Sequence, residues 1–112
     1  MFKVEDGKIS MIEGDFGIVL PIQIEMGEEE QITEDDCFAF KIYEKINEKP
    51  VVEKIYKNIK DNTIPLKLEE DDSKKLKVGT YYCDLDWVQE NSFLNNIIAK
   101  EKFQVKEKAG EI

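Results

Sequence analysis

Two groups of closely spaced carboxylates are the parts of this sequence that could do chemistry. Asp84 and Asp86 lie two residues apart, a spacing that could share a hard cation through oxygen ligands. The acidic run from Glu69 to Asp72 offers a second group. A cation cage also needs carbonyl or amide ligands from a shaped loop, which neither segment supplies. We therefore interpret the first pair as the outward face of a strand and the run as the start of a short helix, and we predict no metal site.

Other catalytic patterns are weak. The chain has no His, which removes the commonest general base, the usual partner of a nucleophilic Ser or Cys, and the commonest transition-metal ligand. Asp15-Phe16-Gly17 matches the metal-holding tripeptide of protein kinases, and Gly14 to Gly17 matches the spacing of a KH-domain loop. A kinase needs a far longer chain, and a KH loop needs nearby cations. We predict no catalytic residue, no cofactor and no enzymatic activity.

The charge balance limits the class of partner. The 112 residues carry a formal net charge of −9, and all 16 cations are Lys. Nucleic-acid binding needs clustered cations, so we expect no nucleic-acid partner. The N-terminus lacks the apolar run of a secretion signal, and no stretch approaches the ~18 apolar residues of a membrane span. We expect no membrane partner and synthesis in a bacterial cytoplasm.

Cys37 and Cys83 are the two cysteines, and a reducing compartment favours two free thiols. The alternative is a bridge of the immunoglobulin kind, in which a Cys follows the corner tyrosine by two residues, as Cys83 follows Tyr81. Against it, no Trp lies shortly after Cys37. We expect both thiols to be reduced.

Alternating apolar and polar residues predict seven to nine strands and one short helical turn. The helical turn is expected over 69–76, because acids come first and lysines last. Strands are expected at 2–4, 7–12, 18–26, 37–44, 51–57, 64–68, 79–88, 93–99 and 103–105, with an acidic loop over 25–36 and a hairpin turn at 89–92. The predicted core is Leu20, Ile22, Ile24, Phe38, Phe40, Ile42, Leu66, Leu68, Tyr81, Cys83, Leu85 and Phe103.

The segment around Tyr81 indicates the fold class. In immunoglobulin-like sandwiches a tyrosine near the start of a late strand sends its hydroxyl back to upstream backbone. Leu76, Gly79 and Tyr81 fit such a structural corner. We therefore expect an all-β, immunoglobulin-like antiparallel β-sandwich as one domain over residues 1–106, followed by a frayed C-terminal tail over 107–112. Trp87 has the phase of a core residue, or else it anchors an interface near the end of a hairpin.

Several segments together resemble a family. They are Gly14-Asp15 before an alternating strand, Phe38-Ala-Phe40-Lys-Ile42, Ile64-Pro-Leu66-Lys-Leu68, the corner with its following strand, and Phe103-Gln-Val105. The chain resembles the small β-sandwich domain of phage and prophage baseplate and tail proteins, and is similar to the N-terminal domain of the phage upper baseplate protein. It differs from that pattern in the acidic loop and in ending soon after the last strand.

The resemblance implies a non-enzymatic structural protein of a phage or prophage tail. Such a protein would act through protein–protein assembly, either by self-association or by docking to larger tail or baseplate proteins, and would end in the virion or tail particle. The alternative is an immunoglobulin-like binding module that recognises a cell-surface or carbohydrate ligand through its loops. Fold alone does not separate these functions.

Overall fold

The computed structural model describes residues 3–5, 8–24, 32, 35–89 and 94–107, and these form eight strands and one short helix. The strands are β1 (Lys3–Glu5), β2 (Lys8–Ile12), β3 (Val19–Gln23), β4 (Cys37–Tyr43), β5 (Val52–Lys57), β6 (Thr63–Lys67), β7 (Gly79–Val88) and β8 (Leu94–Lys106), and the helix α1 (Glu70–Lys74) follows β6. The described part of the chain is all-β apart from this helix, as predicted.

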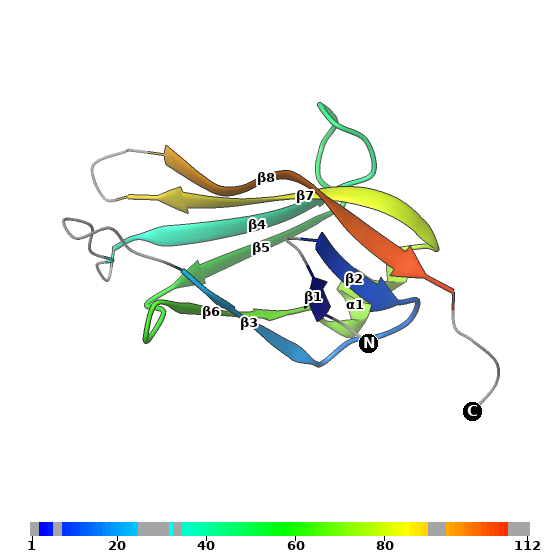
Figure 1. Cartoon of the computed structure of the whole chain (residues 1–112), viewed down its shortest axis with the longest axis horizontal. Coiled ribbons are helices and arrows are strands. Elements are labelled where there is room, and N and C mark those ends of the chain that lie inside the picture. Colours follow the sequence, from blue (N-terminus) through cyan, green and yellow to red (C-terminus); the bar gives the residue numbers. More distant parts are fainter. Residues whose placement is uncertain (1–2, 6–7, 25–31, 33–34, 90–93, 108–112) are drawn as a thin grey trace.

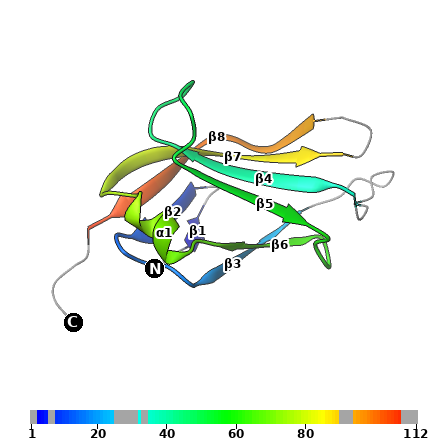
Figure 2. The ribbon, with the colours of Figure 1, turned by 180° about the vertical axis from the view of Figure 1, so that it is seen from behind.

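The strands form two sheets. Six strands make a large sheet in the order β1-β2-β8-β7-β4-β5, and β3 pairs with β6 in a small sheet. Figure 1 shows the small sheet lying below β4 and β5, and Figure 2 shows the same arrangement from behind. Side chains of both sheets meet in one apolar core.

The prediction of a purely antiparallel architecture is wrong for one pair. β2 runs parallel to β8, with Ile9 opposite Phe103 and Met11 opposite Val105, so the large sheet is mixed. A tight hairpin forces neighbouring strands to be antiparallel, but β2 and β8 come from opposite ends of the chain. Their relative direction is therefore set by packing and not by a turn.

The predicted core is confirmed, although two of its residues are less buried than the rest. Leu20 and Ile22 are half-buried and pack against the core, whereas the other ten predicted residues are buried. The buried set also contains residues that the predicted core left out. These are Ile9, Met11, Val52, Ile64, Leu76, Trp87 and Val105.

Several strand boundaries differ from prediction. Ile18 is exposed and precedes β3, because the chain turns at Gly17, whose φ is +79° and whose N–H donates to the Leu68 carbonyl. The C-terminal strands expected at 93–99 and 103–105 are one strand, β8. β8 continues through residues 100–102, and its pairing with β7 shows register shifts between Cys83 and Asp86 of β7.

Several predictions concern residues outside the described ranges. Most of the acidic loop over 25–36, the hairpin turn at 89–92 and residues 108–112 of the tail lie outside the described part of the chain. The predicted helical turn is confirmed as α1 over Glu70–Lys74, and Leu76, which follows it, is buried.

Candidate functional site

The corner residues lie together at the start of β7. The Tyr81 hydroxyl accepts a hydrogen bond of 2.9 Å from the backbone N–H of Lys77, and the Tyr81 ring is buried. Gly79 has a φ of +151°, a conformation that glycine adopts more readily than other residues. Leu76 is buried just upstream. This is the geometry of a tyrosine that ties a strand to the chain preceding it, so these residues have a structural role.

Trp87 lies in the core and is not a surface contact. Its side chain is 2% exposed, its ring stacks on Phe38 with centroids 5.8 Å apart, and its indole N–H donates to the Asp36 carboxylate at 3.1 Å. The reading of Trp87 as an interface anchor is therefore wrong, because the inward phase of β7 carries the ring between the sheets. Asp36 is also buried, so the bond satisfies the indole donor inside the protein.

The short helix is fixed to the edge of the large sheet. The Asp72 carboxylate accepts the backbone N–H of Glu69 at 2.8 Å and forms an ion pair with Lys54 of β5. The Tyr56 hydroxyl, also from β5, accepts the backbone N–H of Lys67 at 3.1 Å. These contacts join β5 to the end of β6 and to α1 itself.

The two thiols are free and far apart along the sheet. Cys37 lies opposite Val88, whereas Cys83 lies opposite Ile42, so five residues of β4 separate the two positions. At about 3.3 Å per residue this exceeds the ~7 Å limit for bridged Cα atoms. Cys83 is buried, and burial raises the pKa of its thiol to about 12, with smaller contributions from Asp84 and Glu101. A thiol in this state is a poor nucleophile.

Asp84 and Asp86 lie on the outward face of β7, as their phase predicted. Their cross-strand neighbours on β4 are Lys41 and Ala39, which are not metal ligands. In the described ranges, no three His, Cys, Asp or Glu residues come together in a way that could hold a metal ion.

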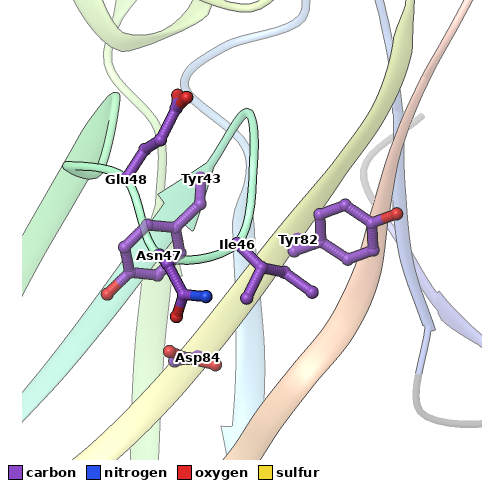
Figure 3. Close-up of a pocket in the computed structure, with 6 residues that line it drawn as sticks. All are labelled: Tyr43, Ile46, Asn47, Glu48, Tyr82 and Asp84. Carbon is purple, nitrogen blue, oxygen red and sulfur yellow. The ribbon is translucent and has the colours of Figure 1, made fainter.

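A pocket on this outward face is the best candidate for a functional site. It has a volume of about 250 Å³ and lies where the loop between β4 and β5 folds over the sheet. Figure 3 shows the rings of Tyr43 and Tyr82 on opposite sides of Ile46 and Asn47, with Asp84 below them. The pocket is lined by Tyr43, Ile46, Asn47, Glu48, Tyr82 and Asp84.

Sheet register and one unusual loop residue build this pocket. Tyr43 and Tyr82 are direct cross-strand partners, and Asp84 follows Tyr82 by two residues on the same face of β7. Asn47 has a φ of +73°, a left-handed conformation that Asn tolerates better than most residues. This turn directs Ile46, which is 42% exposed, over the sheet and not into the core.

The electrostatic field at Tyr43 is negative. Burial raises the pKa of the Tyr43 phenol, and the carboxylates of Asp84, Asp86 and Glu53 raise it further. None of the six lining residues is cationic. The Glu48 carboxylate points away from the other lining side chains in Figure 3, and Asp84 is the carboxylate that raises the pKa of Tyr43 most.

The sheet edges form a second candidate surface. Pro21 and Pro65 face each other in the small sheet, where the backbone N–H of Ile24 bonds to Asn62 three residues further along. Hydrogen-bonded and non-hydrogen-bonded residue pairs alternate along an antiparallel ladder. Pro21 and Pro65 therefore form a non-hydrogen-bonded pair, and both ring nitrogens point to the outer edges of the sheet. Each edge of the small sheet therefore lacks a donor at its centre.

The large sheet has different edges. β1 is three residues long, whereas β5 has six residues and no Pro, and its Ile55 is 58% exposed. The sequence predicts a strand over 51–57 but identifies neither this edge nor the pocket. The tyrosines at 43 and 82 were visible in the alternation, but their pairing required the strand register.

Searches against protein-family models, curated proteins and solved structures found no match to this chain. Within the ranges that the structure describes, no helix is long and apolar enough to cross a membrane.

Proposed function

We propose that this chain is an immunoglobulin-like domain that acts as a non-enzymatic structural component of a phage or prophage tail or baseplate. Immunoglobulin sheets have the neighbours G-F-C, extended by C′ in the variable type, and a facing sheet that contains B and E. The order β8-β7-β4-β5, with β3 and β6 opposite, fits that pattern. The tyrosine of such a fold lies near the start of strand F, which corresponds to β7, where Tyr81 lies.

The chain departs from the standard sandwich in one respect. Among the described residues the small sheet contains β3 and β6 alone, without the strands A and D that flank B and E in the constant type. The parallel pairing of β2 with β8 widens the other sheet instead. The proposal of an immunoglobulin-like domain therefore rests on the order of the paired strands and on the corner.

The observation that carries the assembly role is the β5 edge. An edge strand presents unpaired backbone groups, and a partner strand can satisfy them by extending the sheet. Prolines obstruct both edges of the small sheet, and β1 offers three residues, so β5 is the longest edge without a proline in the described part of the chain. We infer that a partner strand pairs with β5.

A larger and more basic tail protein is the partner that charge favours. Two copies of a chain with net charge −9 repel each other, whereas a basic partner is attracted over distances up to about the Debye length. Docking is therefore favoured over self-association. The resemblance to baseplate domains is the reason for placing this interaction in a phage tail or baseplate.

The experiment asks whether purified phage particles contain the protein. The prophages of the bacterium that encodes the chain are induced, particles are purified on a density gradient, and the chain is detected by mass spectrometry. We expect it in the particle fraction. Ile55→Lys should lower its incorporation, because a charge beside the edge discourages strand addition. Val78→Lys is the matched control, since Val78 is similarly exposed but lies outside β5.

Two results would contradict the proposal. If the chain stays in the fractions that contain no particles, the tail role fails, and a ligand-dependent rise in melting temperature would favour the alternative binding module. If both substituted chains enter particles equally well, the β5 edge is not the contact. Circular dichroism melts of both variants would show that neither result comes from unfolding.

A further inference from the structure

The pocket beneath the β4–β5 loop contains polar and aromatic groups that take no part in the proposed strand pairing at β5. It brings two aromatic rings, an amide and a carboxylate to one place on the outward face of the sheet. We propose that this pocket receives an arginine side chain of a basic partner protein. The inference deepens the proposed function, because it names the chemistry of the partner at a second contact.

Size favours a single side chain over a larger ligand. Sites for drug-sized molecules usually occupy ~300–1,000 Å³, whereas this pocket measures about 250 Å³. A guanidinium group with part of its aliphatic stem fits such a space. Ile46, which is partly exposed at the pocket, offers apolar surface to that stem.

Charge favours a cation over a neutral sugar. A cation over the face of a Tyr ring is attracted by the ring quadrupole, and the pocket offers a ring at each of two sides. The Asp84 carboxylate can accept several hydrogen bonds, including two from one guanidinium. Asp86 and Glu53 lie close enough to act on the Tyr43 phenol, so they add to the same negative field. A sugar would gain none of the charge interactions.

Geometry favours arginine over lysine. The guanidinium group is planar, so it stacks on an aromatic ring and pairs with a carboxylate through two parallel bonds, whereas an ammonium group is a compact point charge. The chain contains no Arg, so a second copy of it cannot supply this group. Lys41, the cross-strand neighbour of Asp84, does not line the pocket.

Peptide titration of the isolated ¹⁵N-labelled chain tests the inference. The probe is acetyl-Gly-Arg-Gly-amide, and its twin contains citrulline, which keeps the shape of arginine but has no charge. We expect the arginine peptide to shift the amide signals of residues 43–48 and 82–84 with a Kd in the millimolar range, roughly that of a single side-chain contact. Raising the salt from 50 to 500 mM should weaken it.

Variants identify the residues. Asp84→Asn should weaken binding of the arginine peptide about tenfold, because it removes the charge-assisted bonds. Asp61→Asn makes the same change of charge at an exposed site away from the pocket and should leave binding unchanged. Tyr82→Ala is a second test that does not alter charge, and it should also weaken binding several-fold.

Other outcomes overturn the inference. Equal shifts with the citrulline peptide would show that charge is not recognised, and saturable shifts of the same residues with N-acetylglucosamine would show a carbohydrate site. Absence of shifts at 20 mM arginine peptide would show that the pocket binds neither. A negative result here with normal incorporation into particles would overturn the pocket but leave the proposed function intact.

Discussion

Tyr81 gives the clearest prediction at the scale of a single residue. Its hydroxyl accepts the Lys77 N–H at 2.9 Å, so Tyr81→Phe removes one hydrogen bond and leaves the ring in the core. We expect a loss of about 1–2 kcal/mol in the free energy of unfolding, measured by urea titration with Trp87 fluorescence. Tyr82→Phe is the control and should cost less than ~0.5 kcal/mol. Equal stability of wild type and Tyr81→Phe would show that the bond contributes nothing.

The two cysteines should differ in reactivity. The thiolate is the reactive form, and the pKa of Cys83 is raised to about 12, so almost none of it is ionised at pH 8. Cys37 is half-exposed. We expect a colorimetric thiol reagent to modify one thiol per native chain quickly and both thiols after denaturation. Cys37→Ser should abolish the fast reaction.

The same shift makes stability depend on pH. The folded pKa of Cys83 lies above its ordinary value of 9.0, so the folded state holds this proton more tightly than the unfolded chain does. Its contribution is therefore complete below pH 9 and is lost as pH rises toward 12. Rapid modification of both native thiols at pH 8 would contradict this account of Cys83.

At the scale of elements, alternation predicted most strands because one face of each is buried. Cys37–Tyr43 and Gly79–Val88 alternate strictly between inward and outward residues, and both were predicted within one residue of their observed ends. The parallel pairing of β2 with β8 had no local signal, since no turn connects the two strands. Pairing between distant segments depends on tertiary packing, which periodicity does not encode.

The helix α1 supplies the prediction at this scale. Asp72 accepts the Glu69 N–H at the start of the helix and pairs with Lys54 of β5, so one side chain connects two elements. Asp72→Ala should lower the free energy of unfolding by about 2 kcal/mol, because it removes a capping bond and a largely buried ion pair. Thermal melts followed by circular dichroism would measure this loss.

Asp71→Ala is the matched control, since Asp71 is exposed and adjacent in the same helix. Its effect should stay within ~0.5 kcal/mol. If Asp71→Ala and Asp72→Ala destabilise the protein equally, then helix propensity or overall charge explains the loss, and the contact with β5 does not.

At the scale of the whole molecule, the candidate pocket depends on three levels of structure. The sequence placed Tyr82 and Asp84 outward on one strand. It could not place Tyr43 beside them, because that requires the register of β4 against β7. Nor could it place Ile46 and Asn47 over the sheet, which depends on the left-handed turn at Asn47. A site made by strand register and loop shape has little signal in a single sequence.

The association state is the last prediction, and it follows from charge and edges together. Net charge −9 and the prolines at the centres of both small-sheet edges oppose self-pairing, so the isolated chain should sediment as a 13.1 kDa monomer at low salt. Replacing Pro21 and Pro65 by Thr restores a donor to each edge in a residue that favours strands. We expect the double variant to form dimers or larger species in 0.5 M salt, where charge repulsion is screened.

Sedimentation velocity at several protein concentrations would measure this association. Pro50→Thr is the control, because Pro50 lies outside both strands of the small sheet and its replacement opens neither edge. A double variant that remains monomeric would show that the prolines do not protect the edges. A wild-type chain that already forms a closed ring at low salt would show that self-association, and not a basic partner, covers the β5 edge.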